Sequence, residues 1–304
     1  MTPPNAEPAP RYANDFIEQH LDECAATLAA YCESDLLAFN GDLLFPVDEE
    51  VRKVVEKMKA VRGAGKRKKL SVVLTTSGGY IEVVQRMVDT FRHHYRIVDF
   101  IVPNYAYSAG TVLALSGDTI HMNYFSRLGP IDPQVHSNRG LPVPALGYLI
   151  QYERLLKKAS DGTITGPEVS LLLNFDQAEL YYIEQARELS VELLKRWLVR
   201  YKFKNWKVTA TRKLPVTAKM KVTRAEEIAR ELNNSARWHS HGFGLSMEVL
   251  RRNLKVMIDD FDKDPQLSQA VAAYQSLLDD YMIKRGNAGV LHTVGQYVPF
   301  MSVA

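Results

Sequence analysis

The sequence predicts an α/β fold built on a parallel sheet, with helices added at both ends of the chain. Two observations carry this prediction. Apolar runs of strand length are each followed by a turn and a helical repeat, and that order recurs along the chain. Parallel strands in such an order are joined by right-handed crossovers. The 304 residues are 46% hydrophobic and 24% charged, which is ordinary for a globular protein.

The first half of the chain alternates predicted helices and strands. Apolar residues at helical spacing, and one small-residue run, predict helices over 12–32, 48–62, 80–94 and 109–115. Short apolar runs predict strands over 35–44, 70–75, 97–102 and 119–122. The run Leu70 to Thr75 (LSVVLT) is almost wholly apolar, as a strand buried on both faces should be.

After residue 140 the pattern becomes mostly helical. Helices are predicted over 144–159, 167–199, 223–232 and 266–284. Thr223 is the expected cap of the third. Residues 206–222 alternate loosely and predict a basic β-hairpin, and the last twenty residues are expected to be irregular. The stretch 167–199 is long for a core helix, so we expect another subunit to cover its apolar positions: Leu171, Leu172, Leu180, Ile183, Leu189 and Leu194.

Charge is spread unevenly. The net charge is +3, yet residues 195–224 hold eleven Lys or Arg and no Asp or Glu, leaving 27 basic and 35 acidic groups elsewhere. A basic segment on an acidic body indicates either a local electrostatic role or a solvated face. No stacking motif or nucleic-acid fold signature accompanies it, so we do not expect nucleic-acid binding.

The sequence also bears on compartment and cofactors. No stretch of about 18 uncharged apolar residues occurs, so we expect no membrane insertion. Residues 1–11 are Pro-rich and lack a signal-peptide pattern, which predicts a disordered leader and no secretion. The two cysteines, Cys24 and Cys32, fit a reducing cytoplasm and give no zinc pattern. We expect no cofactor.

Ser108 is the first candidate for chemistry. It lies in Tyr107-Ser108-Ala109-Gly110, after an apolar strand and at the start of a helix. Small neighbours suit a nucleophile on a sharp strand-to-helix turn, because bulky ones would block the substrate. The N–H groups and the dipole of the helix N-terminus would stabilise an oxyanion there. Alternatively, Ser108 only caps the helix.

A second turn follows the buried strand. In Ser77-Gly78-Gly79 the glycines let the backbone bend so that an N–H faces a ligand. Such an N–H and that of Ala109 could form a two-donor oxyanion hole. Both loops would lie at the carboxyl ends of parallel strands, where α/β sites form. Alternatively, the glycines serve only a structural turn.

Two further segments carry polar residues. Arg127 to Gln134 contains a glycine and two prolines, which predict a rigid turn. Residues 237–243 bring His239 and His241 together, and histidine is the usual base at neutral pH. A third metal ligand is not evident beside this pair, so a base is the preferred interpretation over a metal site. Alternatively, either histidine is only part of the polar surface.

Three motifs together resemble a known family. Thr75-Thr76-Ser77-Gly78-Gly79, Ala106 to Thr111 and Leu128 to Gln134 occur in the order and spacing of the serine dehydrogenase proteinase family, which is related to signal peptide peptidase A and ClpP. Residues 236–256, with Trp238 and His241, resemble a later stretch of that family. The resemblance covers about 35–260. It implies a ClpP/crotonase-like β/α spiral, oligomers, Ser108 as nucleophile, and oxyanion donors at Gly78 and Ala109.

The resemblance has gaps, and the general base is the main one. Family members often carry an N-terminal membrane helix that this chain lacks, and the basic stretch near 204–222 looks like an insertion. The position of the ClpP histidine falls near Pro130 to Asp132 here, so the base must come from elsewhere. His241 is the preferred candidate; Lys157 or Lys158 is the alternative, by analogy with signal peptide peptidases. Asp132 could orient the base or bind the substrate main chain, and Gly79 is counted with the substrate-binding loop.

The leading hypothesis is therefore a serine endopeptidase of polypeptide substrates, without cofactor, forming a cytoplasmic homo-oligomer. A crotonase-type acyl-CoA enzyme and a catalytically weak assembly scaffold of the same fold are the alternatives. The predicted organisation is a leader and helix over 1–34, the peptidase domain over 35–260, and a C-terminal helix and tail over 261–304.

Overall fold

The main sheet of the protein is largely parallel, as predicted. A computed structural model describes residues 12–62, 67–131, 134–136, 142–209, 211–234, 237 and 244–302. Within them, seven strands form one sheet in the order β10-β5-β3-β2-β1-β11-β12. Their bounds are β1 (Asp35–Asn40), β2 (Lys69–Thr75), β3 (Ile97–Ile101), β5 (Thr119–Met122), β10 (Asp259–Asp260), β11 (Asn287–Thr293) and β12 (Gln296–Ser302). The first five in that spatial order, β10 to β1, run parallel to one another. β11 pairs antiparallel with β1 on one side and with β12 on the other.

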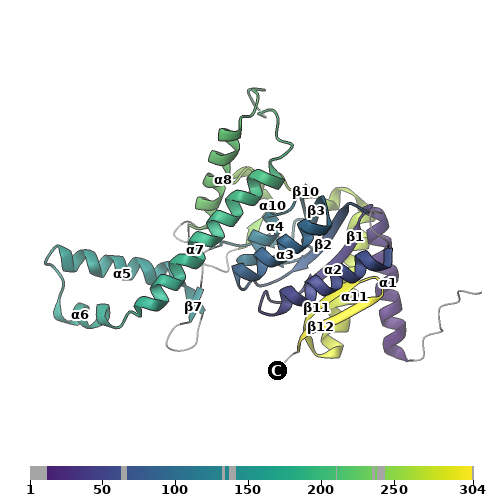
Figure 1. Ribbon diagram of the computed structural model, residues 1–304, viewed down its shortest axis with the longest axis horizontal. Coiled ribbons are helices and arrows are strands. Elements are labelled where there is room, and N and C mark those ends of the chain that lie inside the picture. The colour runs from purple at the N-terminus through teal and green to yellow at the C-terminus, as the bar shows by residue number, and fades with distance from the viewer. Residues whose placement is uncertain are drawn as a thin grey trace, which may run out of the picture.

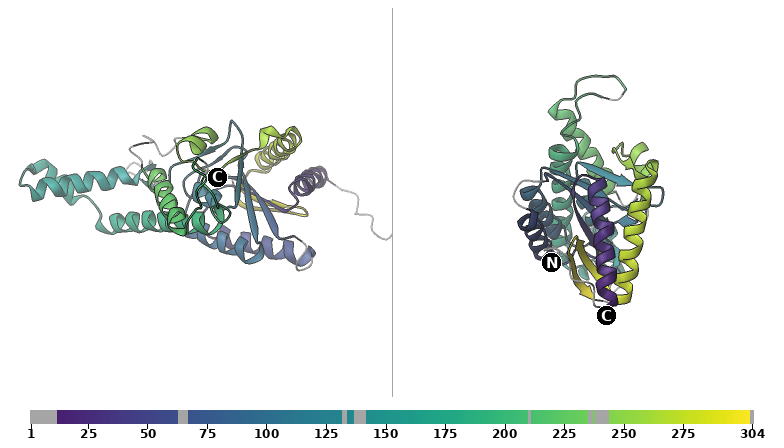
Figure 2. Two further views of the ribbon diagram at one scale, coloured as in Figure 1. Left: turned by 90° about the horizontal axis from the view of Figure 1, so that it is seen from above. Right: turned by 90° about the vertical axis from the view of Figure 1, so that its right-hand side faces the viewer.

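Helices cover both faces of this sheet. One face carries α1 (Ala13–Tyr31) and α11 (Pro265–Arg285), which lie side by side in Figure 2. The other carries α2 (Val47–Arg62), α3 (Ile81–His94) and α4 (Ala109–Leu115) (Figure 1). Because successive strand residues point to opposite faces, β2 serves both cores: its Val72 and Leu74 lie in the cluster with α3, and its Val73 lies in the cluster with α1 and α11.

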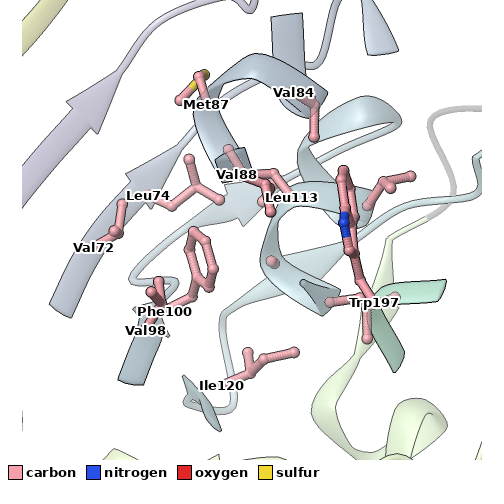
Figure 3. Packing of buried hydrophobic residues seen from close by; sticks show 14 of the residues in the cluster. Val72, Leu74, Val84, Met87, Val88, Val98, Phe100, Leu113, Ile120 and Trp197 are labelled. Atoms are coloured by element: carbon pink, nitrogen blue, oxygen red, sulfur yellow. The ribbon is translucent and has the colours of Figure 1, made fainter. Parts of the chain in front are cut away.

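The larger core also holds the end of a long helix. In Figure 3, Phe100 of β3, Val88 of α3 and Leu113 of α4 lie in the same cluster as Trp197. Trp197 is the last residue of α7 (Gln177–Trp197), and a π-helical turn, η1 (Leu198–Lys202), follows it. Burying a side chain of this size contributes on the order of 2–3 kcal/mol, so this end of α7 is firmly anchored.

The remaining elements lie around this centre. The short strands are β4 (Tyr105–Ala106), β6 (Arg127–Leu128), β7 (Gln134–His136), β8 (Pro142–Pro144) and β9 (Leu245–Ser246). The other helices are α5 (Ala145–Ser160), α6 (Gly166–Leu173), α8 (Ala218–Leu232), α10 (Met247–Arg252) and η2 (Phe261–Lys263). Figures 1 and 2 show α5 and α6 extending away from the sheet; we call this pair the arm. None of the described helices is both long and apolar enough to cross a membrane.

Two predictions between residues 167 and 232 are wrong. The single helix over 167–199 is two helices, because the Asp176 side chain accepts hydrogen bonds from the N–H groups of Ala178 and Glu179 and so begins α7. The predicted hairpin over 206–222 has one bridge, Val208 to Pro215, and α8 begins at Ala218. Its cap is Thr217, whose hydroxyl accepts from Met220, and not Thr223.

The expectation of an irregular C-terminal tail is also wrong. After Gly286 ends α11 in the left-handed conformation (φ +65°), residues 287–302 form the β11–β12 hairpin, and β11 pairs with β1. Pro299 is tolerated because β12 is the edge strand of the sheet, where one N–H can be missing from the ladder. The C-terminal segment is thus part of the main sheet.

Candidate active site

Ser108 lies on a strained turn between β4 and α4. Its backbone angles are φ 51° and ψ −122°, a conformation that residues other than glycine rarely adopt. The sequence permits the turn because the neighbours are small: a Cβ at Gly110 would lie 2.3 Å from Cγ2 of Thr76. Ser108 stands at the N-terminus of α4, yet its side chain makes no capping hydrogen bond. The alternative that it only caps the helix is therefore wrong.

The glycine turn faces Ser108 directly. Gly78 and Gly79 have φ of +116° and +143°, in the region that favours glycine. A Cβ on Gly78 would lie 2.8 Å from Cβ of Ser108, and one on Gly79 would lie 2.3 Å from the carbonyl oxygen of Leu43. The two turns are joined by backbone hydrogen bonds, since Thr76 N–H donates to Tyr105 O and Tyr107 N–H donates to Thr76 O.

The third motif braces the same turn. The N–H of Gly129 donates to the Thr111 hydroxyl at 2.8 Å, and that hydroxyl lies 2.8 Å from the carbonyl oxygen of Ala106. A Cβ on Gly129 would lie 2.8 Å from the ring of Tyr107. The predicted rigid turn therefore packs against the backbone on both sides of Ser108, which holds the strained conformation in place.

The backbone donors around Ser108 are not equivalent. The N–H of Gly78 donates to the Thr76 hydroxyl at 3.1 Å. Within the described part of the chain, the N–H groups of Gly79 and Ala109 have no hydrogen-bond partner. An unpaired N–H beside a cavity is free to bind a ligand oxygen. Gly79 and Ala109 thus carry the N–H groups of these two turns that have no partner in the described structure.

A cavity of about 410 Å³ opens over these turns. Its lining residues come from the segment after β1, the glycine turn, the starts of α3 and α4, the segment after β6 and one face of α7: Asp42, Leu44, Ser77, Gly78, Gly79, Tyr80, Ile81, Glu82, Ser108, Ala109, Ile131, Tyr182, Ala186 and Ser190. The structure therefore brings together Ser108, Ala109, Gly78 and Gly79. No lysine or histidine lines the cavity among the described residues.

The sequence pattern did not predict that residues of α7 line the cavity. Tyr182, Ala186 and Ser190 recur every four residues, so they share one face of the helix. That spacing is visible in the sequence, but it has no functional meaning until α7 is known to cross the cavity. Asp42 was missed too; its carboxylate accepts a hydrogen bond from the Ser77 hydroxyl.

The candidate lysines do not reach this cavity. Lys157 and Lys158 lie on α5, in the arm that extends from the sheet (Figure 1). The Lys158 ammonium is paired with Glu168 of α6, and this hydrogen bond lowers the pKa of Glu168 to about 2. Neither lysine is among the described residues that line the cavity.

The other predicted site residues, His241 and Asp132, lie outside the described residues, as does His239. Segments next to Asp132 and His241 in the sequence are described, and they lie near Ser108. Ile131 lines the cavity, and β9 pairs with β6, which in turn pairs with β4. No group of three or more His, Cys, Asp or Glu side chains in the described ranges is placed to hold a metal ion.

The sequence matches a family described as ClpP-like SDH-type serine proteinases over residues 45–213. The chain belongs to this family. The match includes Ser108, both glycines of the turn and Ala109, and it ends before His241. It confirms the family predicted from the three motifs, and with it a ClpP-like α/β fold.

Curated relatives cover the chain in part. Two uncharacterized proteins of Methanocaldococcus jannaschii are similar to it: one is 30% identical over 155 residues, which is 48% of this chain and 53% of the relative. The other is 29% identical over 140 residues, 46% of this chain and 43% of the relative. The chain thus spans about half the length of the curated relatives it matches.

Solved structures with a similar arrangement include a mutant of the 1510-N membrane-bound stomatin-specific protease in complex with a substrate peptide. The TM-score is 0.43 at 14% identity, covering 88% of this chain and 86% of the other. ClpP1 from Listeria monocytogenes gives a TM-score of 0.40 at 10% identity, covering 80% of this chain and 94% of the other.

Proposed function

We propose that this protein is a serine endopeptidase that cleaves polypeptides through an acyl-Ser108 intermediate. The observation that carries the proposal is Ser108 itself: it has a positive φ at the N-terminus of α4, its side chain makes no capping hydrogen bond, and it lines a cavity. A strained backbone of this kind costs about 1–3 kcal/mol and persists where neighbours enforce it, most often at functional sites.

The chemical step follows from this geometry. The Ser108 hydroxyl gives its proton to a base while Oγ bonds to the carbonyl carbon of the peptide. The C–N bond then breaks, the amine leaves with that proton, and water hydrolyses the acyl ester. The oxyanion of each tetrahedral intermediate would accept hydrogen bonds from Ala109 and Gly79, the two N–H groups without a partner in the described structure.

We propose His241 as the base. Leu245 of β9 lies two strands away from β4, which ends two residues before Ser108. Neighbouring strands lie about 4.8 Å apart, and the four residues from His241 to Leu245 span at most about 14 Å. This short connection between His241 and β9 supports His241 as the base over the lysines of the arm. Ile131 lines the cavity and Asp132 is the next residue in the sequence, which supports a role in orienting the base or the substrate.

Covalent labelling tests the proposed function. A fluorophosphonate probe should add one adduct per chain, and peptide mapping should place it on Ser108, because only an activated hydroxyl reacts readily. Ser77 lines the same cavity and is the internal control, which should stay unlabelled. A chain that takes up no probe would favour an acyl-CoA enzyme or an inactive assembly scaffold of the same fold.

The glycine turn gives a second prediction. Gly78→Ala should lower kcat/KM for a peptide by about 10²- to 10³-fold, because the added methyl would displace Ser108 and the neighbouring N–H of Gly79, and misplacing an oxyanion donor costs about as much as losing it. The new methyl would lie 2.8 Å from Cβ of Ser108, at φ +116°. Gly162→Ala is the matched control, since Gly162 also has positive φ (+67°) but nothing within 4 Å of the added Cβ. Equal activity of the two variants would remove the turn from the mechanism.

We also propose that a second copy covers part of the arm. Leu180, Ile183 and Leu194 of the long apolar stretch are buried within the chain itself, but no residue of α6 is buried. Leu171 and Leu173 are 57% and 79% exposed. Such an apolar surface favours a homo-oligomer, and a monomeric mass by light scattering at micromolar concentration would contradict it.

The cysteines support a cytoplasmic location, which stays a proposal. Cys24 and Cys32 are both free thiols, and burial raises the pKa of Cys32. Persistent free thiols are usual in reducing compartments. Recovery of the protein from an oxidising compartment after cell fractionation would contradict this location.

A further inference from the structure

A second, larger cavity lies at the amino-terminal ends of the parallel strands, whereas Ser108 lies at their carboxyl-terminal ends. It has a volume of about 740 Å³ and is lined by Lys59, Ala60, Arg67, Lys68, Arg92, His93, His94, Tyr95 and Arg96. Seven of these nine residues are basic and none is Asp or Glu; we call it the basic basin. It adjoins the starts of β2 and β3, whereas Ser108 and Gly78 follow the carboxyl ends of neighbouring strands. It shares no lining residue with the Ser108 cavity.

Three of its cations are held by partners inside the protein. The Lys59 ammonium lies 3.8 Å from a carboxylate oxygen of Asp35. Arg92 forms an ion pair with Asp118 at 2.7 Å. Arg67 has no carboxylate in this set, but donates to two carbonyl oxygens at and just after the end of α1. These side chains are fixed in place and form the floor of the basin.

The other four basic residues have no such partner. Within the described ranges, Lys68, Arg96, His93 and His94 make no side-chain hydrogen bond or ion pair, and Lys68, Arg96 and His93 are exposed. The rings of His93 and His94 meet edge to face at 4.7 Å. Their ring nitrogens and the two cationic heads are therefore available to a ligand.

The C-termini of nearby helices explain only part of this accumulation of positive charge. Helices α1, α2 and α3 all end beside the basin, and a helix C-terminus attracts cations with about half a negative charge. Asp35 and Asp118 offset two of the five formal positive charges of Lys59, Arg67, Lys68, Arg92 and Arg96. Three helix ends offset about one and a half more. An excess of more than one positive charge remains before either histidine is protonated.

We propose that the basic basin binds a soluble ligand carrying two or three linked phosphate groups. Guanidinium and ammonium groups bind phosphate oxygens through charge-assisted hydrogen bonds, and a guanidinium binds two at once. Linked phosphates carry more negative charge than a single orthophosphate ion, and their length lets them contact several separate cations around the cavity at once. The volume falls within the roughly 300–1,000 Å³ of small-ligand sites. The proposal does not depend on the serine peptidase activity.

Titration calorimetry with inorganic tripolyphosphate tests the site on the full chain, at about 0.15 M salt to screen weak surface attraction. Wild type should bind one tripolyphosphate per chain, and orthophosphate more weakly. The double variant Lys68→Gln, Arg96→Gln should bind about tenfold more weakly or worse, since each lost charged hydrogen bond is costly. Both side chains are exposed, and unchanged thermal unfolding would show that the variant folds.

The matched control is Lys207→Gln, Arg212→Gln. It removes the same two charges from exposed positions of the basic segment 195–224. This control should bind tripolyphosphate like wild type. Equal weakening in both double variants would reduce the effect to net charge and overturn the proposal, as would undetectable binding by wild type.

A membrane source of phosphate is tested separately. Vesicles of phosphatidylcholine with phosphatidylglycerol should not retain the protein at the same salt concentration. If they retain wild type but not the Lys68→Gln, Arg96→Gln variant, and tripolyphosphate fails to release it, the site binds lipid headgroups and the soluble-ligand proposal is wrong.

Discussion

Replacing Ser108 with alanine should lower peptide hydrolysis by about 10⁴-fold or more, the usual effect of removing a nucleophile. The fold should survive, because the Ser108 hydroxyl makes no capping hydrogen bond and alanine keeps the same Cβ on the same strained turn. Steady-state kcat/KM on a fluorogenic peptide, with circular dichroism for the fold, would check both parts.

Ser77→Ala is the matched control for this substitution. Ser77 lines the same cavity and donates its hydroxyl hydrogen to Asp42. It lies in the glycine turn but is not placed on a strained strand-to-helix turn, so its loss should cost less than about tenfold, the value of one ordinary hydrogen bond. Near-normal turnover by Ser108→Ala, or equal losses in the two variants, would refute Ser108 as nucleophile.

The second large effect is expected at the base. His241→Gln should lower kcat/KM by about 10³- to 10⁴-fold, and adding Ser108→Ala should make it little worse, since members of one catalytic unit are not additive. His239→Gln, two residues away, is the matched control and should be mild. If Lys157→Met or Lys158→Met abolishes peptide hydrolysis while the His241→Gln enzyme stays active, the chain is instead a Ser-Lys peptidase.

The pH profile gives an independent reading of the same base. A histidine accepts a proton only when neutral, so protonation at low pH removes activity. The rate should therefore rise as pH passes the ordinary histidine pKa of about 6.5 and level off by about pH 8. A lysine base of ordinary pKa would go on gaining rate well above pH 8. A profile still rising at that point would count against His241.

The parallel core could be predicted because its signals are local. The run Leu70 to Thr75 is apolar enough to identify a strand buried on both faces, and the structure has it as β2 (Lys69–Thr75). The predicted bounds of the helix over 109–115 and the strand over 119–122 match the structure. Small residues around Ser108 likewise predicted the turn, because only they fit it.

The rest depends on contacts between distant segments. The hairpin of β11 and β12 is stabilised by pairing β11 with β1, about 250 residues earlier, and nothing in its own sequence overrides Pro299 and the flanking glycines. The α7 side of the cavity is missed for the same reason: Ala186 and Ser190 are ordinary helix residues until another segment faces them. The choice between Gly78 and Gly79 depends on one hydrogen bond to Thr76.

The position of α7 has a mechanical consequence. Its 21 residues span about 31 Å at 1.5 Å per residue. Trp197 fixes one end in the core, Tyr182 to Ser190 border the cavity, and the other end meets the arm through a short turn at 174–176. A helix of this length behaves as a stiff rod pivoted at its buried end. A displacement of the arm would therefore also displace the α7 residues that line the cavity.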